Sequence, residues 1–343
     1  MSDDIALRAF LAPILEILKD PEVNEITINK PHEYIIEKAD GKQFIETEMF
    51  SMDDLHELAI LIATNSSQKI NSKNPILSAS LPDGERVQIV ISPAVEKGQI
   101  AMSIRKPTVL DLSIDDYQSS GSFDDVVVVH DEYMSEIDSE LLRLKNEGNI
   151  AEFLKKAVKN KKNIIISGGT SSGKTTVTNA MIKEIPLDER IISIEDVREV
   201  VLKQPDRLHL LCSKGGQGEA KVTPKELLEA CLRLNPDRIM LSELRGEEAF
   251  YFLRAVNSGH AGSITTLHAD STKGCFDQIV MMVNQGDTNL TEESIREYLH
   301  KVIDVVIQFK KVGSQRKMTE LYFEPTGKIR PESSKVDIKA VGT

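Results

Sequence analysis

The chain has 343 residues, more than one domain of roughly 100 to 200 residues usually holds, so two domains are expected. Lys and Arg number 42 against 54 Asp and Glu, a net charge of -12, which argues against a surface built mainly to hold nucleic acid. The three cysteines, Cys212, Cys231 and Cys275, are widely spaced and include no CxxC pair, so they indicate neither a disulfide framework nor a zinc site.

The N-terminal segment does not have the features of a secretion signal. Asp3 and Asp4 stand where a signal peptide would be basic. No segment of the sequence reaches the roughly 18 uninterrupted apolar residues that a transmembrane helix needs. We therefore expect a cytoplasmic protein whose association with a membrane is peripheral and runs through a protein partner.

The first third of the chain mixes helical and strand patterns. Apolar residues from Leu7 to Leu18 recur at helical spacing, and a second helix is expected to begin after Ser51. Short strand patterns surround these helices, with a hairpin turn at Asp40 and Gly41. We predict a smaller α+β domain with a mainly antiparallel sheet over residues 1–116, followed by a polar, acidic linker with room for a short helix over 117–149.

The second half alternates apolar strand runs with helical patterns. The strand runs fall at 163–167, 190–195, 238–243 and 263–268. Such alternation is typical of a parallel sheet covered by helices on both faces. This predicts an α/β domain over 150–325, and the polar segment 326–343 is expected to be a disordered tail.

A glycine-rich sequence follows the first of these strands and precedes a helix. It is made of Gly168, Gly169, Thr170, Ser171, Ser172, Gly173, Lys174, Thr175 and Thr176. Glycines allow the backbone to curl so that several N–H groups point at one phosphate chain, and the helix adds its positive end. In this pattern Lys174 reaches the β- and γ-phosphates and the Thr175 hydroxyl ligates Mg²⁺, so the sequence predicts a site for a nucleotide with Mg²⁺.

Four candidate site residues end neighbouring strand runs. Glu243 closes the run 238–243, where an acid could orient water or link to Mg²⁺, although it could also cap the next helix. Glu195 and Asp196 end another run and could hold the Mg²⁺ shell, or serve as solvated turn residues. His268 ends the last run, where a histidine is more often structural than functional.

One further candidate lies far from this sequence. Arg105 belongs to the strand pattern IAMSIR of the first domain. Taken alone it is an exposed cation. It would matter chemically only if the two domains closed over one nucleotide, since a guanidinium could then stabilise charge on the γ-phosphate.

Four segments together resemble the secretion ATPase superfamily. They are GGTSSGKTT, IEDVREV, LRLNPDRIMLSELRGEEA and SGHAGSITTLHA, which are similar in order to its Walker A, Asp box, Walker B and His box. LPDGERVQIVISPA and SIRKP in the first domain resemble the type IV secretion branch. The likeness extends over nearly the whole chain, to about residue 325.

The resemblance implies a C-terminal RecA-like P-loop ATPase domain behind the N-terminal domain, six copies in a ring, and ATP with Mg²⁺ held between domains. It assigns Lys174 and Thr175 to the phosphates and metal, Glu195 to the Asp box, Glu243 to the catalytic acid, His268 to the His box and Arg105 to a phosphate contact from the N-terminal domain. Ser242 departs from the usual glycine before the catalytic glutamate. The long segment 124–149 leaves open whether each N-terminal domain covers its own nucleotide or a neighbour's.

The function expected from this resemblance is ATP hydrolysis that powers transfer or pilus assembly by a bacterial type IV secretion system. The expected partners are five further copies and inner-membrane secretion components at the cytoplasmic face of that membrane, without stable nucleic acid binding. A pilus-retraction or type II secretion motor is one alternative. A nucleotide-gated scaffold with little turnover is another, and a small-molecule phosphotransferase is a third, for which no acceptor site is visible.

Overall fold

The structure, a computed structural model, describes residues 2–107, 112–124, 126, 134–213, 220–286 and 289–325. The predicted tail 326–343 lies outside this range, as do residues 125 and 127–133 of the predicted linker. None of the helices in the described ranges is both long and apolar enough to cross a membrane.

The N-terminal part forms a six-stranded antiparallel sheet, in the order β3-β2-β1-β6-β5-β4. Its strands are β1 Val23–Ile28, β2 Glu33–Lys38, β3 Gly41–Glu46, β4 Ile76–Ser80, β5 Arg86–Val90 and β6 Ala101–Arg105. The helices α1 (Ser2–Leu18) and α2 (Met52–Asn65) pack together and share one apolar core with the sheet. This confirms the predicted α+β architecture.

Local sequence signals account for two of these elements. Ser51 caps α2 by accepting from the backbone N–H of Asp54, whose carboxylate accepts in return from the backbone of Ser51. This reciprocal pair satisfies two N–H groups that a helix start leaves without partners. Gly41 has a φ of 136°, which only glycine adopts without strain, so the turn between β2 and β3 depends on it.

The C-terminal part forms a seven-stranded sheet in the order β13-β12-β7-β11-β10-β8-β9. Its strands are β7 Ile164–Gly168, β8 Ile191–Glu195, β9 Arg207–Leu211, β10 Arg238–Leu241, β11 Ile264–Leu267, β12 Val305–Val312 and β13 Gln315–Phe323. All neighbouring pairs are parallel except β12 with β13. The predicted parallel core is confirmed, with an antiparallel edge strand that the sequence pattern missed.

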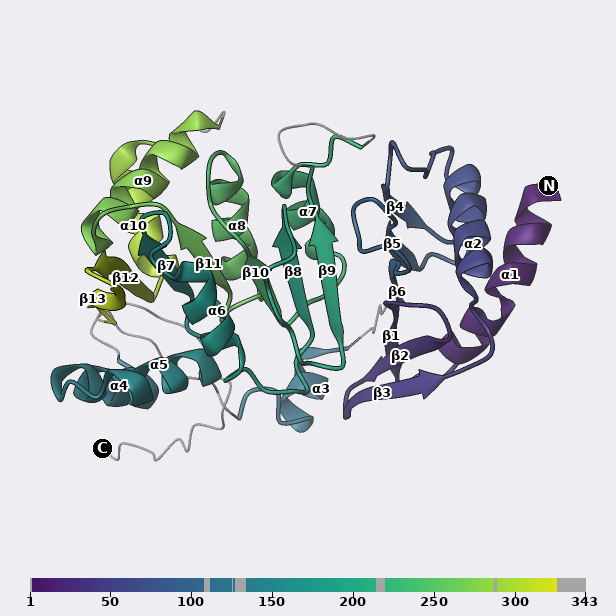
Figure 1. Ribbon diagram of the computed structural model, residues 1–343. Coiled ribbons are helices and arrows are strands. Elements are labelled where there is room, and N and C mark those ends of the chain that lie inside the picture. The colour runs from purple at the N-terminus through teal and green to yellow at the C-terminus, as the bar shows by residue number, and fades with distance from the viewer. Residues whose placement is uncertain are drawn as a thin grey trace.

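Helices cover both faces of this sheet (Figure 1). They are α4 Glu136–Asn146, α5 Ile150–Lys159, α6 Lys174–Ile182, α7 Pro224–Cys231, α8 Glu248–Asn257, α9 Thr272–Gln285 and α10 Glu292–Val302. Ile164 and Ile166 of β7 pack in the core that contains α4, α5 and α6, while Ile165 packs in the core that contains α7 to α10. Burial on both faces explains why these strands read as continuous apolar runs.

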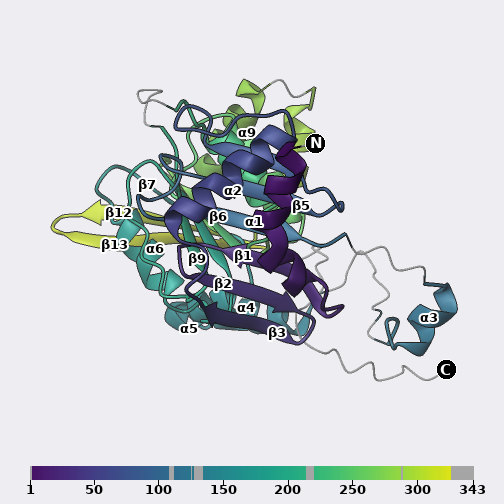
Figure 2. The same ribbon diagram turned by 90° about the vertical axis from the view of Figure 1, so that its right-hand side faces the viewer.

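The segment predicted as a linker contains two helices with different surroundings. The short α3 (Ile114–Ser119) has no buried residue and stands apart from both sheets (Figure 2). By contrast, Leu141 and Leu144 of α4 are buried against α5 in the core of the second part. Structurally, α4 belongs with the C-terminal sheet.

The two parts meet along the edge strand β9 (Figure 1). The segment between β5 and β6 adds a bridge there, because Val95 pairs with Leu210 and the backbone N–H of Leu211 donates to Ala94 O at 2.8 Å. Ala94 and Val95 are buried in the core of the C-terminal part. The N-terminal part therefore covers an edge that would otherwise expose unpaired backbone groups.

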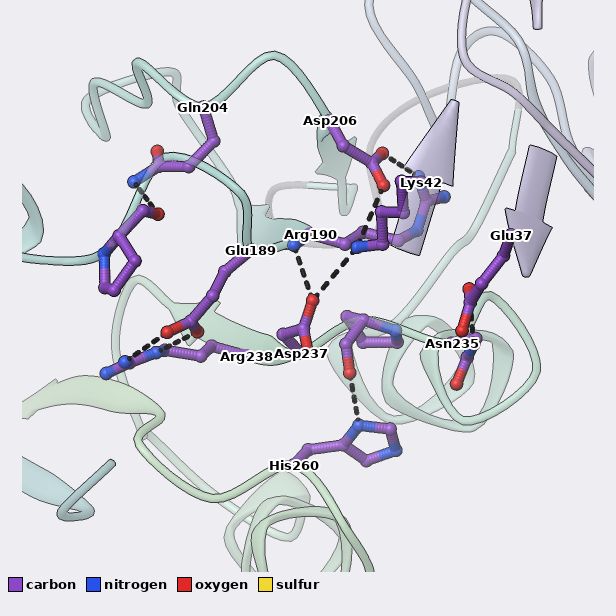
Figure 3. Close-up of polar contacts among 12 residues, drawn as sticks. Glu37, Lys42, Glu189, Arg190, Gln204, Asp206, Asn235, Asp237, Arg238 and His260 are labelled. Atoms are coloured by element: carbon purple, nitrogen blue, oxygen red, sulfur yellow. Dashed lines mark hydrogen bonds and ion pairs between the residues drawn. The ribbon is translucent and has the colours of Figure 1, made fainter. Parts of the chain in front are cut away.

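An ionic cluster joins the same two parts at the amino ends of β8, β9 and β10 (Figure 3). Arg190, only 1% exposed, pairs with Asp206, which also accepts from Asn29 Nδ2 at 3.0 Å. Lys42 Nζ lies 3.4 Å from Asp206 and 3.0 Å from Asp237. Asn29 and Lys42 of the N-terminal part thus bond to charged groups of the C-terminal part, and each buried charge has a partner, which burial of ions requires.

We predict that Asp206→Ala lowers the free energy of unfolding by about 3–5 kcal/mol, because it leaves the buried Arg190 guanidinium without its carboxylate. Urea unfolding followed by circular dichroism measures the loss. Glu147→Ala removes an exposed helix ion pair with Arg143 and should stay near the parent. Equal unfolding midpoints for the two variants would contradict this role of the cluster.

Candidate active site

The glycine-rich loop joins β7 to α6 in a conformation that its residue types require. A β-carbon on Gly168 would lie 2.5 Å from the carbonyl oxygen of Phe309 in β12 and 2.5 Å from Ser172 Oγ. Gly173 has a φ of 96° and caps α6, and a β-carbon there would meet Arg316 Cδ at 2.7 Å. The loop is closed so tightly that only glycine fits at both positions.

Lys174, the first residue of α6, turns back over this loop. Its Nζ donates to the carbonyl oxygens of Gly168 at 2.8 Å and Gly169 at 3.2 Å. Burial lowers the pKa of Lys174, and the negative charge of Glu243 opposes that shift. The ammonium group therefore sits inside the curl of the loop, where phosphate oxygens would replace the two carbonyls as partners.

Glu243 and His268 reach the same point from neighbouring strands. Both follow strand ends, Glu243 after β10 and His268 after β11, and parallel strands bring those ends to one edge of the sheet. His268 Nε2 lies 2.7 Å from Glu243 Oε1, and the two ring nitrogens of His268 lie 3.4 and 3.5 Å from Lys174 Nζ. The structure thus brings together three residues that the sequence placed at separate motifs.

Arg245 adds a cation that the sequence analysis did not single out. Its guanidinium lies 2.6 Å from Glu243 Oε2 and 2.9 Å from Asp196 Oδ2. Arg245 contacts Glu243 Oε2 through both Nε, at 2.7 Å, and Nη2, so it orients the carboxylate, while Oε1 faces His268 without a hydrogen bond in the described chain. Asp196, weighed as a metal ligand or a turn residue, has Arg245 as its partner.

Thr175, which the sequence predicts to ligate Mg²⁺, has Glu199 as its acidic neighbour. The hydroxyl of Thr175 donates to Glu199 Oε2 at 3.1 Å, and Asn179 Nδ2 donates to the backbone carbonyl of Glu199 at 2.9 Å. Glu199, in the loop after β8, is therefore the acid beside Thr175, whereas the carboxylate of Glu195 is engaged elsewhere. Glu199 lies inside the motif IEDVREV, four residues after the Glu195 that the sequence analysis selected.

Glu195 is fully buried and organises the loop that follows it. Ser193 Oγ donates to its Oε1 at 2.6 Å, with His209 Nδ1 3.3 Å away, and the backbone N–H groups of Glu199 and Val200 each donate to Oε2 at 2.7 Å. Burial alone would raise the pKa of this carboxyl, but these hydrogen bonds outweigh it and bring the pKa to about 2. Glu195 acts on Thr175 only indirectly, by shaping residues 199 and 200.

Arg105 is not brought to the loop within one chain. It ends β6 and lines a pocket of about 330 Å³ together with Arg86, Arg233 and Asn235. Arg233 and Asn235 precede β10, so this pocket lies at the amino ends of the parallel strands, whereas Lys174 follows the carboxyl end of β7. Arg105 and Lys174 therefore lie at opposite ends of the parallel strands.

The loop has a second neighbour that sequence reasoning missed. Arg316 of β13 donates from Nε to the carbonyl oxygen of Ser171 at 3.1 Å, and its side chain covers Gly173. No local pattern links an exposed arginine in a late hairpin to a loop encoded so much earlier. Only the placement of β12 beside β7 brings them together.

The residues present fit a nucleotide with Mg²⁺. The loop has no room for side chains at two glycines, its Lys174 points inward, and Ser172 Oγ is buried without a hydrogen-bond partner in the described chain. No group of three or more His, Cys, Asp or Glu side chains within the described ranges could hold a metal ion. Thr175 and one acid still suit Mg²⁺, which takes few protein ligands and completes its shell with phosphates and water.

Comparison with known proteins agrees with the four motifs. The family model described as type II/IV secretion system protein matches residues 9–321. Type IV secretion system protein VirB11 of Bartonella henselae is 45% identical over 327 residues, 92% of each chain. The Brucella suis protein of that name is 38% identical over 326 residues, 93% of this chain and 90% of its own. A crystal structure of the Brucella suis VirB11 ATPase with sulphate superposes with a TM-score of 0.87 at 36% identity, covering 94% of this chain and 98% of that one.

The hydrogen bonds around Glu195 generate a pH prediction. Its folded pKa of about 2 lies below the ordinary value of 4.5, so the stabilisation is complete above pH 4.5 and is lost as the pH falls toward 2. We expect Glu195→Gln to unfold at lower urea concentration than the parent at pH 7, with the gap narrowing through this window. A gap that does not change with pH would show that the charge of Glu195 contributes nothing.

Proposed function

Because the chain belongs to the type II/IV secretion system protein family, we propose that it is an ATPase of the VirB11 type whose ATP hydrolysis powers a bacterial type IV secretion system. This proposal rests on one observation: the side chains of Lys174, His268 and Glu243 lie in contact with one another beside the glycine-rich loop. The glycine-rich loop and Lys174 alone would bind a nucleotide. An acid held at the same point provides for turnover.

Each of these side chains has a role that its position supports. The loop and Lys174 hold the β- and γ-phosphates and offset their charge, as oriented N–H groups and an ammonium do in phosphoryl transfer. Glu243, fixed between His268 and Arg245, orients the attacking water. His268 lies between Lys174 and Glu243, so it is placed to respond to the γ-phosphate and to set the position of the acid.

Mg²⁺ bound beside Thr175 would neutralise charge on the transferring phosphoryl group. Thr175 is the protein ligand that both sequence and geometry support. We propose that Glu199 takes the part first assigned to Glu195, since its carboxylate is the one within 3.1 Å of the Thr175 hydroxyl. Glu195 then supports the metal site through the backbone of residues 199 and 200.

Lys174→Ala tests the site assignment. The variant should keep its fold, because within the described residues Nζ bonds only to loop carbonyls and His268, and should lower steady-state phosphate release by about a hundredfold or more. Circular dichroism verifies the fold, and release is measured with and without Mg²⁺. Undiminished turnover in this variant would refute the assignment.

The alternatives make different predictions in the same assay. A nucleotide-gated scaffold would bind ATP with scarcely any Mg²⁺-dependent turnover, and the orientation of Glu243 speaks against it. A pilus-retraction or type II motor would hydrolyse ATP equally well, but the close relatives above favour the type IV branch. A phosphotransferase would leave a phosphorylated small molecule.

The position of Arg105 supports a ring of copies, which we propose to be a homohexamer. Within one chain, Arg105 and the phosphate loop lie at opposite ends of the parallel strands. A phosphate contact by Arg105 therefore needs the nucleotide of a second copy. Arg86 and Arg233 line the same pocket and make it suited to an anionic group. The pocket would then be completed by the neighbour's nucleotide, which is the second of the two alternatives left by the long segment 124–149.

Mixing two inactive variants tests this arrangement. Lys174→Ala and Arg105→Ala should each be nearly inactive alone, but in mixed rings about a quarter of the interfaces would combine an intact Lys174 with an intact Arg105 from the next copy. Recovery of phosphate release on mixing is therefore expected, together with a ring-sized species on gel filtration. Absence of recovery in rings shown to be mixed would place Arg105 outside the neighbour's site.

The remaining assignments rest on the family and on the fold. We propose a location at the cytoplasmic face of the inner membrane, through secretion components, with no stable nucleic acid binding. We also propose the domain division at 1–116 and 150–325, with 117–149 between them. The burial of Leu141 and Leu144 would add α4 to the second domain.

A further inference from the structure

We propose that Glu96, in the segment between β5 and β6, is a positioning residue for the metal side of the nucleotide site. It acts through Arg198 on the loop 196–200 and so on the carboxylate of Glu199. This inference rests on the proposed function, because it takes the pair of Thr175 and Glu199 to be the Mg²⁺ side of that site.

The loop 196–200 is held from the nucleotide side by α6. The Thr175 hydroxyl and Asn179 Nδ2 both donate to Glu199, and Asn179 Oδ1 accepts the backbone N–H of Val201 at 2.9 Å. These contacts fix where the loop lies along α6. Glu195 also holds the loop, through the backbone N–H groups of residues 199 and 200.

Arg198 holds the other side of the loop. Its guanidinium donates to the Val200 carbonyl at 2.5 Å and to Glu195 Oε1 at 3.3 Å, and its Nε donates to Glu96 Oε1. The guanidinium is planar, so a partner on Nε restricts the direction in which Nη1 points. Glu96 thus fixes the orientation of a side chain that ties Glu195 to the end of the loop.

Glu96 can do this because its own backbone is fixed to the C-terminal sheet. The two preceding residues, Ala94 and Val95, are buried against β9 and bonded to it. The Glu96 carbonyl also accepts the N–H of Gln99 at 3.0 Å, which closes the turn before β6. Side chains of Glu96 and Arg198 are about one-third exposed, at 31% and 34%, so the pair is partly shielded from water.

The N-terminal part therefore contacts β8 and β9 beyond both of their ends. The cluster of Arg190 and Asp206 lies at the amino ends, and the pair of Glu96 and Arg198 lies past the carboxyl end of β8. A shift of the N-terminal sheet would pull on Arg198 and change how Glu199 meets Thr175. By linkage, occupation of the metal side would in turn favour one position of that sheet.

The test measures binding of fluorescently labelled ADP to the full chain, with excess Mg²⁺ and with EDTA. The dissociation constant in EDTA divided by the dissociation constant with Mg²⁺ reports the Mg²⁺-dependent part of the affinity. Glu96→Ala should reduce that ratio by about tenfold, the lower end of the effect seen for residues that orient metal ligands, while the constant in EDTA stays unchanged. Glu96→Gln, which keeps a weaker acceptor for Arg198, should fall between Glu96→Ala and the parent.

Two comparisons make the outcome decisive. Glu16→Ala removes an exposed ion pair of α1 and should match the parent. The double variant Glu96→Ala/Arg198→Ala should lose no more than Arg198→Ala alone, because both changes act on one path. If the parent binds ADP more tightly with Mg²⁺ and Glu96→Ala does so equally, the positioning role is wrong. If the parent gains nothing from Mg²⁺, the proposed function fails and the inference with it.

Discussion

The close passage of the glycine-rich loop under its neighbours is the constraint on which the site depends. Gly168 touches the β12 backbone and Ser172, and Gly173 lies beneath Arg316, so a single methyl group at either position would open the curl. That curl holds the Nζ of Lys174 against the carbonyl oxygens of Gly168 and Gly169. β7, β11 and β10 are parallel, so their carboxyl ends lie together. His268, after β11, and Glu243, after β10, therefore lie beside Lys174. The chemistry follows from sheet topology as much as from the loop itself.

Three glutamates near the loop differ in burial and in their hydrogen-bond partners. Glu195 is fully buried, and it fixes the backbone that follows by accepting hydrogen bonds from the N–H groups of residues 199 and 200. Glu199, on that backbone, is the acid that reaches Thr175. Glu243 has one oxygen toward a histidine and the other toward an arginine. Three glutamates near one site thus have three roles, and residue type alone would not distinguish them.

The sequence predicted what depends on local pattern. The loop, the four strands that surround it, the cap at Ser51 and the antiparallel N-terminal sheet follow from spacing and residue type, and the structure has all of them. It did not predict β9, β12 or β13, because the neighbours of a strand in a sheet are set by tertiary packing. For the same reason the contacts of Arg316 with the loop and of Glu199 with Thr175 were out of reach. Arg105 was identified by resemblance, but its distance from the loop in one chain needed the fold.

The position of β12 and β13 has a consequence for how the chain acquires its site during synthesis. β12 pairs directly with β7, from Val305 beside Ile164 to Phe309 beside Gly168, and β13 supplies the arginine that covers Gly173. These strands are among the last described parts of the chain to leave the ribosome. The phosphate loop is translated before both strands, so its walls are complete only after β12 and β13 have been made. A chain that stopped before β12 would therefore carry the glycine-rich motif without the strands that close around it, and its nucleotide binding should be impaired.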